Sequence, residues 1–298
     1  MNEIIALGTS SMTPTKERNH SSFMIRYRGE IILFDCGEGT QRQLRFINVS
    51  PMKIKRIFIT HWHGDHVLGL PGLIQTLAGN NYKDTLEIYG PSGTKERVKR
   101  LLEIFPFDTE IDLKIREIKK DGIVFSNEFY EIIAMKLEHS IECYGYSFKE
   151  KDKRKINKIK IKKFGLKEGP ILRKIKEEGS VIIDNRKITF EDIGFIEKGK
   201  KITYIVDTRL CNNAIKLAEN SDILIIESTY HSSLQNKAEE YFHLTSKDAA
   251  MIAYLSKSKK LILTHFSQRY KDVNELLEEA REIFPNTVAA YDFMRIKF

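Results

Sequence analysis

Cysteine is scarce in this 298-residue sequence, which contains only Cys36, Cys143 and Cys211. An odd number of widely spaced cysteines without a CxxC pair argues against a disulfide framework. None of the three stands beside other ligand types at metal-site spacing, which also argues against a thiolate metal site. We therefore expect three buried free thiols.

Long hydrophobic runs are also missing from the sequence. No segment approaches the roughly 18 uninterrupted apolar residues that span a bilayer. Residues 1–8 lack the basic n-region and the long apolar h-region of a signal peptide. We expect a first β-strand there instead, no membrane contact, and a cytoplasmic protein. The length allows either two domains or one large α/β unit.

Acidic residues are scarce in one segment, residues 149–176. This segment holds thirteen Lys or Arg residues against three Asp or Glu residues, whereas the whole chain has a net charge of +8. The remainder of the chain is therefore slightly acidic. A solvated charged insertion is the ordinary explanation, but so strong an excess of one sign favours contact with a nucleic acid. Gly165 and Gly169-Pro170 interrupt the segment, so it is not one long helix.

Short apolar runs rich in β-branched residues alternate with amphipathic segments in both halves of the sequence. Each half contains several predicted strands, so two sheets covered by outer helices are favoured over one doubly wound sheet. Strands are predicted at residues 4–7, 22–27, 31–36, 54–60, 85–89, 131–137, 143–148, 201–206, 223–226 and 260–264. Helices are predicted at residues 41–46, 67–77, 94–105, 246–255 (with Ser246 as its N-cap) and 273–284.

The run HWHGDH, from His61 to His66, directly follows a predicted strand. Alternate residues of an extended segment point to the same side, so His61 and His63 can bind one ion together. Gly64 allows the chain to turn, which lets Asp65 and His66 face a second ion. Imidazole and carboxylate groups suit zinc and similar ions. The run therefore predicts a metal site.

Two ions need more ligands than this run supplies. Of three further candidates elsewhere in the sequence, His139 follows a predicted strand, and Asp207 and His265 each end one. Strand ends at one edge of a sheet sandwich are natural places for ligands to converge. Each residue alone could equally be a capping or solvated polar group, but together they fill the missing positions. His20 and His231 receive no assignment.

Further motifs extend nearly from end to end of the sequence. A GLPGL run ends at Leu73, and shorter motifs begin at His243 (HLT) and Arg269 (RY). Others are LGTS at 7–10, PTKERN at 14–19, LFDCGEGTQ at 33–41, CYGY at 143–146, DTR at 207–209 and ESTY at 227–230. The HxHxDH run alone marks only the metallo-β-lactamase superfamily. In combination, these motifs resemble its ribonuclease Z family.

The sequence departs from that family's pattern at three places. Trp62 stands where an aliphatic residue is more usual, and Val206 stands where Gly often precedes the bridging Asp. Residues 10–13 replace a Gly-containing stretch. None of these positions is a ligand, but the last change could alter the fit of RNA near the cut.

The resemblance implies an α/β protein, an αββα four-layer sandwich formed by one metallo-β-lactamase-fold domain over residues 1–298. It implies two Zn²⁺ ions per subunit, with Mn²⁺ or another divalent ion as an alternative. Asp65 is implied to accept a proton, and Glu227 to orient His243 toward the leaving oxygen. The implied ligands are His61, His63 and His139 for one ion, Asp65, His66 and His265 for the other, and Asp207 as a bridge.

The implied activity is endonucleolytic removal of the 3′ trailer from tRNA precursors. Cleavage after the discriminator nucleotide would leave a 3′-hydroxyl on the tRNA and a 5′-phosphate on the trailer. The family's flexible tRNA-binding arm, its exosite, corresponds here to residues 149–194. A homodimer is implied, in which one subunit's arm serves the other subunit's site. Residues implied in substrate binding are Arg209, Arg269, Gly169, Pro170, Lys160, Lys162 and Lys163.

Two other functions are compatible with the residues alone. The ligand set also suits another phosphodiesterase or an ester, thioester, lactone or β-lactam hydrolase on the same fold. The basic segment and the motifs at His243 and Arg269 favour RNA over these. An RNA-binding protein with a vestigial metal site is disfavoured, because all seven ligand positions are present.

Overall fold

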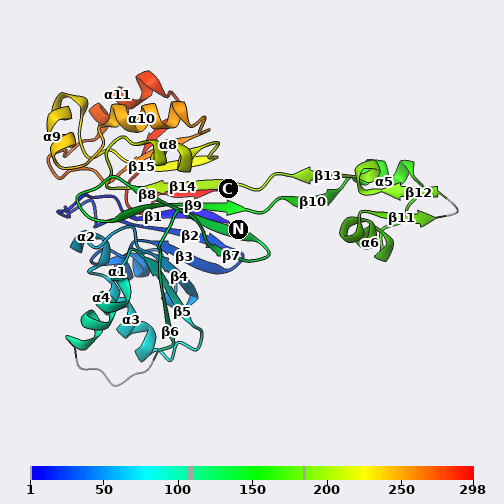
Figure 1. Ribbon diagram of the computed structural model, residues 1–298, viewed down its shortest axis with the longest axis horizontal. Coiled ribbons are helices and arrows are strands. Elements are labelled where there is room, and N and C mark those ends of the chain that lie inside the picture. Colours follow the sequence, from blue (N-terminus) through cyan, green and yellow to red (C-terminus); the bar gives the residue numbers. More distant parts are fainter. Residues whose placement is uncertain (1, 106–110, 184–185) are drawn as a thin grey trace.

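Two large β-sheets stacked face to face, with helices outside each, form the body of this computed structural model (Figure 1). The structure describes residues 2–105, 111–183 and 186–298. A slender projection leaves one side of the body. The expected four-layer sandwich is thereby confirmed. Within the described residues, every helix is too short or too polar to cross a bilayer.

The first sheet contains the strands β18 (Arg295–Lys297), β1 (Glu3–Gly8), β2 (Ser22–Tyr27), β3 (Glu30–Phe34), β4 (Ile54–Phe58), β5 (Leu86–Gly90) and β6 (Leu113–Glu117), in this spatial order. Strands β3 to β6 run parallel to one another, whereas β1 pairs antiparallel with both β2 and β18. The carboxyl ends of β3 and β4 therefore lie at the same edge.

The second sheet contains β17 (Thr287–Ala289), β16 (Leu261–Thr264), β15 (Ile223–Glu227), β14 (Lys201–Ile205), β9 (Cys143–Glu150), β8 (Tyr130–Leu137) and β7 (Gly122–Ser126), in this order. Strands β14 to β17 are parallel, and β9 runs antiparallel to both β14 and β8. Strand β8 consequently ends at the same edge as β14, β15 and β16.

Helices cover the outer face of each sheet. Leu44, Leu73 and Val98 pack beneath the first sheet, and Leu217 and Leu276 pack against the second. The helices of the body are α1 (Thr40–Phe46), α2 (Gly64–Val67), α3 (Leu70–Gly79), α4 (Thr94–Glu103), α8 (Asn212–Ala218), α9 (Gln235–Glu240), α10 (Ser246–Leu255) and α11 (Asn274–Ile283), with short 3₁₀ turns η1 (Pro51–Lys53) and η2 (Ser232–Leu234).

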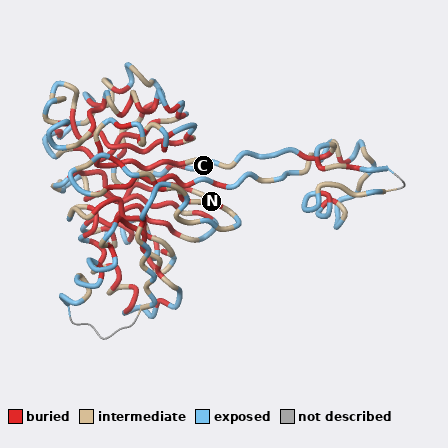
Figure 2. The backbone as a smooth tube through the Cα atoms, viewed as in Figure 1, coloured by how far each residue is buried: buried red, intermediate tan, exposed pale blue. Residues whose placement is uncertain are grey.

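Aromatic side chains fill much of the space between the two sheets. Tyr27 from the first sheet meets Tyr130 and Phe148 from the second, with ring centroids 5.5 and 5.1 Å away. Such edge-to-face contacts add to the burial of large apolar surfaces. Buried residues accordingly concentrate along the strands of the body (Figure 2). This packing holds the strand ends of both sheets in a common frame.

The projection consists of residues 153–197 and has a small core of its own, which includes Leu172, Ile175 and Phe190. The resemblance predicts an arm over residues 149–194. Lys149 and Glu150 instead belong to β9, and residues 184–185 lie outside the described residues. Its elements are β10 (Lys153–Ile156), α5 (Lys158–Lys163), α6 (Pro170–Glu178), β11 (Ser180–Ile183), β12 (Arg186–Thr189), α7 (Phe190–Ile193) and β13 (Gly194–Glu197).

Two local predictions are wrong. The single helix over residues 67–77 is divided into α2 and α3 by Gly69, where an added Cβ would lie only 2.2 Å from the Gly37 carbonyl oxygen. This close approach leaves no room for a side chain at residue 69, and the backbone N–H of Gly69 donates to the Cys36 carbonyl instead of continuing the helix. The N-cap of α10 is Thr245, whose side chain accepts a hydrogen bond from the first turn, and not Ser246.

Candidate metal centre and active site

Strand ends from both sheets meet at one edge of the sandwich and carry the candidate metal ligands. The run from His61 to His66 follows β4 in the first sheet. In the second sheet His139 follows β8, Asp207 follows β14, and His265 follows β16. The structure brings together all seven ligand candidates that the sequence suggested, in four overlapping groups.

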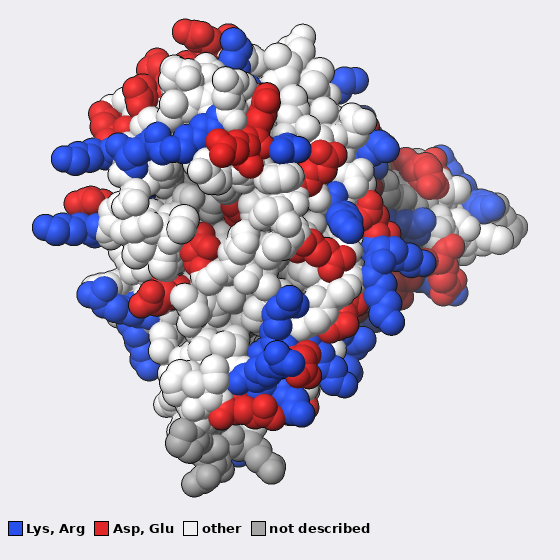
Figure 3. All heavy atoms as spheres, turned by 60° about the vertical axis from the view of Figure 1, so that its left-hand side comes forward, with Lys and Arg blue, Asp and Glu red and all other residues white. Residues whose placement is uncertain are grey.

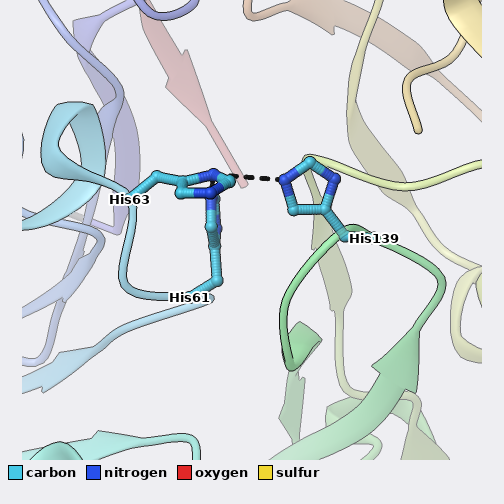
Figure 4. Close-up of side chains that lie close together, drawn as sticks. All are labelled: His61, His63 and His139. Atoms are coloured by element: carbon cyan, nitrogen blue, oxygen red, sulfur yellow. Dashed lines mark hydrogen bonds between the residues drawn. The ribbon is translucent and has the colours of Figure 1, made fainter. Parts of the chain in front are cut away.

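Three imidazole groups form the first cluster (Figure 4). His61 Nε2 lies 3.0 Å from His63 Nδ1, and His139 Nε2 lies 3.2 Å from the same nitrogen. Nitrogens this close fit one ion, since zinc binds imidazole at about 2.0–2.1 Å. Burial, with the neighbouring imidazole of His66, lowers the pKa of His61 well below its ordinary value. His61 is therefore neutral, the form that binds metal.

Asp65, His66 and His265 form the second cluster, and Asp207 lies between the two clusters. Asp207 Oδ2 is 2.9 Å from His66 Nε2, 3.3 Å from His265 Nε2 and 3.7 Å from His61 Nε2. Despite these short distances, three of these buried atoms (His66 Nε2, His265 Nε2 and Asp207 Oδ2) have no hydrogen-bond partner within the described ranges. Buried polar atoms are ordinarily satisfied. Converging, unsatisfied ligand atoms fit bound metal ions.

Four of the histidines are oriented by a contact at Nδ1, which leaves Nε2 free for a metal ion. One of the four contacting groups, Thr60, directly precedes the HWHGDH run, and the other three come from distant segments. Sequence reasoning missed them, although Asp35 gave a signal because it too follows a strand, β3. The pairs are His61 with the Thr60 hydroxyl (3.0 Å), His66 with Asp35 (2.8 Å), His139 with the Phe242 carbonyl (3.2 Å) and His265 with the Thr229 hydroxyl (3.0 Å).

The backbone is strained at four residues of this site. Asp35, Asp207, Phe242 and His265 all have φ between 54° and 60°, in the left-handed region. A non-glycine residue there costs on the order of 1 kcal/mol or more. Such strain persists only where the surroundings hold it, and it is typical of functional sites. Asp35, Asp207 and His265 follow strands and Phe242 follows helix α9, so the chain turns sharply at the ends of these elements.

Glu227 and His243 form a buried pair beside the ligands. His243 Nδ1 lies 3.0 Å from Glu227 Oε2 and 3.2 Å from Asp207 Oδ1. The backbone N–H of Thr208 donates to the other oxygen of Glu227, at 2.7 Å. Burial alone would lower the pKa of His243, but the charge of Glu227 and its hydrogen bond raise it to about 9. The carboxylate of Glu227 therefore favours the protonated form of His243.

Asp65 lies at the rim of the second cluster, and its carboxylate is 3.3 Å from His66 Nε2 and 3.8 Å from His265 Nε2. Burial alone would raise the pKa of Asp65. His66 and His265 outweigh burial and hold the pKa well below its ordinary range. Asp65 is therefore ionised at neutral pH and is able to accept a proton or a hydrogen bond.

A cavity of about 550 Å³ opens in front of these groups. Its polar lining includes His63, Asp65, His139, Asp207 and His243. Met12, Leu68, Tyr241 and Phe242 line it as well, together with Glu240. The cavity therefore gives a substrate direct access to the candidate ligands and to the Glu227–His243 pair.

The other predicted substrate-binding residues lie outside this cavity. Arg209 stacks 3.8 Å above the Phe242 ring and lines an adjacent hollow together with His243. Arg269 lies 5.1 Å above the Tyr230 ring. The remaining five lie on the projection and do not line the cavity: Lys160, Lys162 and Lys163 in α5, and Gly169 and Pro170 at the start of α6.

Comparisons with known proteins identify the family. The sequence model of the metallo-beta-lactamase superfamily matches residues 15–151. A ribonuclease Z from Methanothermobacter thermautotrophicus is 42% identical over 298 residues, covering 100% of this chain and 97% of that protein. A ribonuclease Z from Bacillus cereus (strain B4264) is 40% identical over 304 residues, covering 97% of each.

The fold agrees with this relationship. The crystal structure of human tRNase Z, short form, superposes with a TM-score of 0.74 at 29% sequence identity, covering 99% of this chain and 98% of that one. The Bacillus subtilis protein YhfI shares the fold with a TM-score of 0.70 at 18% identity. The chain therefore belongs to the ribonuclease Z family of endoribonucleases, within the metallo-beta-lactamase superfamily.

Proposed function

We propose that this protein removes the 3′ trailer from tRNA precursors in the cytoplasm. It would cleave after the discriminator nucleotide and leave a 3′-hydroxyl on the tRNA and a 5′-phosphate on the trailer. The observation that carries the proposal is the convergence of seven ligand candidates beside the Glu227–His243 pair. Full-length similarity to proteins named ribonuclease Z supports the choice of substrate.

We further propose two Zn²⁺ ions per subunit. Two such ions would lower the pKa of a water molecule and offset the charge of the phosphoryl oxygens. The ligands would be His61, His63 and His139 for one ion, Asp65, His66 and His265 for the other, and Asp207 for both.

The acid–base groups of the chain would complete the reaction. Asp65 is ionised and faces the cavity, so it would accept the proton of the attacking water. Glu227 holds Nδ1 of His243 and favours the protonated ring, which would donate a proton to the leaving 3′ oxygen. Glu227 keeps the ring in one orientation and favours the charged form.

The projection would bind the tRNA away from the cut. Lys160, Lys162 and Lys163 lie in its helix α5, and most of the strong basic excess of residues 149–176 lies on it. In Figure 1 it points away from the side of the body where α2 carries Asp65 and His66. This arrangement supports a homodimer in which the projection of one subunit serves the site of the other. Phosphate contacts there would read shape rather than sequence.

The proposal is tested by metal-dependent cleavage of a 3′-extended precursor tRNA. We expect cleavage by the purified protein, loss of activity after dialysis against a chelator, and recovery when Zn²⁺ or Mn²⁺ is added. D65A should fold normally and lose most of the rate. Hydrolysis of small esters without any cleavage of the precursor would contradict the proposed substrate.

A further inference from the structure

Large apolar side chains gather at the mouth of the active-site cavity. Met12 is 80% exposed, Leu68 52% and Tyr241 50%, and all three line the cavity. Clustered exposed apolar side chains mark binding surfaces, whereas single ones are ordinary. The face turned forward in Figure 3 likewise has uncharged side chains over much of its middle. Of the residues that line the cavity, only Glu240, beside Tyr241, is both charged and exposed, so a substrate also meets apolar surface at this mouth.

Met12 lies in a loop that hydrogen bonds hold in place, and its side chain is exposed to solvent. Its carbonyl oxygen accepts a hydrogen bond from His20 Nε2 at 3.0 Å, and the Ser10 hydroxyl donates to the Thr13 carbonyl at 2.7 Å. The φ angle of Met12 is +24°, which is unfavourable for a residue with a side chain. The exposed side chain of Met12 buries little apolar surface, so it does not offset the cost of the strained backbone. Backbone strain of this kind is typical of functional sites.

Tyr241 stands next to the proposed acid. It ends helix α9 two residues before His243, and Phe242, between them, contacts the ligand His139 through its carbonyl. His243 would protonate the leaving 3′ oxygen, so the nucleotide that bears this oxygen must lie beside Tyr241. Every nucleobase has a flat π face that stacks on aromatic side chains, whatever its sequence.

We propose that Tyr241, Met12 and Leu68 form a subsite for one nucleobase, that of the last nucleotide of the tRNA. This inference rests on the proposed function and adds to it. The subsite places the scissile phosphate by stacking and apolar contact, without hydrogen bonds that would read the base. It therefore accepts precursors that differ in this nucleotide.

The test compares two precursors, one intact and one with an abasic last nucleotide. Wild type should show a KM about tenfold higher for the abasic precursor, in keeping with the energy of one base–aromatic stack. Y241A should show the same increase on the intact precursor and no further increase on the abasic one. Y241F should resemble wild type, because the ring is retained. Y254A, which removes an exposed tyrosine of α10 outside the cavity, should also resemble wild type.

Two results would overturn the subsite. One is an equal KM of wild type for both precursors. The other is a Y241A effect that is equally large on both precursors, because the ring would then not contact the base. Failure of the proposed function would look different, since wild type would cut neither precursor, and the subsite would fall with it. Circular dichroism checks that the variants fold.

Discussion

A histidine ring binds a metal ion well only when its orientation is fixed. In four histidines of this site a neighbouring group contacts Nδ1 and so fixes the orientation of the ring. His265 is an example, because its Nδ1 contacts the hydroxyl of Thr229 at 3.0 Å while its Nε2 faces Asp207. Groups that orient ligands in this way are worth roughly 10- to 100-fold in metal affinity or activity.

Replacing Thr229 by Val keeps the shape of the side chain and removes this contact. We expect T229V to bind Zn²⁺ roughly 10- to 100-fold more weakly, measured by competition with a chromogenic chelator. T203V is a matched control, because it removes a buried hydroxyl that contacts Ser147 and Ser221 instead of a ligand. If T229V retained wild-type affinity, the orienting role of Thr229 would be refuted.

Asp292 provides a test of pH dependence outside the metal centre. It accepts hydrogen bonds from Thr9 and from the backbone N–H of Asn19, but burial raises its pKa to about 6 from the ordinary 3.8. A raised folded-state pKa stabilises the protein fully below about pH 4, and this stabilisation is lost as the pH rises through about 6.

The variant D292N cannot ionise and should not lose this contribution. We expect its free energy of unfolding to rise relative to wild type by roughly 1–3 kcal/mol between about pH 4 and pH 7. Urea denaturation at a series of pH values measures the difference. If the difference in unfolding free energy between D292N and wild type stays constant, or falls as the pH rises, the pKa of Asp292 is not raised in the folded protein.

The sequence predicted the ligand candidates because each one ends or follows a strand, a feature visible in local patterns. It did not predict partners such as Thr229, which lies 36 residues before His265. Nor did it single out Met12, whose loop shows no pattern except its departure from the family. Such contacts depend on how distant segments pack, which no local pattern records.

At the scale of elements, the projection behaves as an appendage with its own core. Its first and last strands pair with each other, with Lys153 opposite Glu197, so the chain leaves and re-enters the body at one place. The charge pattern predicted the insertion but not its helices, whose apolar residues are dispersed among lysines. The projection begins after Glu150, because Lys149 and Glu150 pair with β8 and so continue β9.

Removing residues 154–196 and joining the ends through an Asn-Gly turn should leave the body folded. We expect the KM for precursor tRNA to rise by at least about tenfold, because phosphate contacts are lost, and its salt dependence to weaken. Hydrolysis of bis(p-nitrophenyl) phosphate, a small substrate, should be unchanged. Equal losses on both substrates would show that the projection supports the cavity rather than the tRNA.

At the scale of the whole molecule, the basic residues of the proposed tRNA contact lie apart from the candidate metal ligands. Most of the basic excess lies on the projection, while the ligands and the cavity lie on the body, and the projection points away from α2. One precursor would therefore span two subunits of the proposed homodimer. For each cleavage event, one subunit would provide the projection that binds the tRNA and the other subunit would provide the active site.

This arrangement predicts complementation between two inactive subunits. The projection deletion and D65A should each process precursor tRNA poorly as homodimers. Co-expressed with different affinity tags and purified as mixed dimers, they should regain a substantial share of wild-type activity, because one intact projection serves one intact site. Mixed dimers no more active than either parent would exclude service between subunits.

The most direct measurement of the central claim is the position and chemistry of the cut. A precursor tRNA without an encoded CCA, carrying a labelled trailer, is incubated with the Zn²⁺-loaded protein, and both products are mapped at nucleotide resolution. We predict one cut after the discriminator nucleotide, with a 3′-hydroxyl on the tRNA and a phosphatase-sensitive 5′-phosphate on the trailer. Scattered cuts, a 3′-phosphate on the tRNA, or stepwise shortening of the trailer would contradict it.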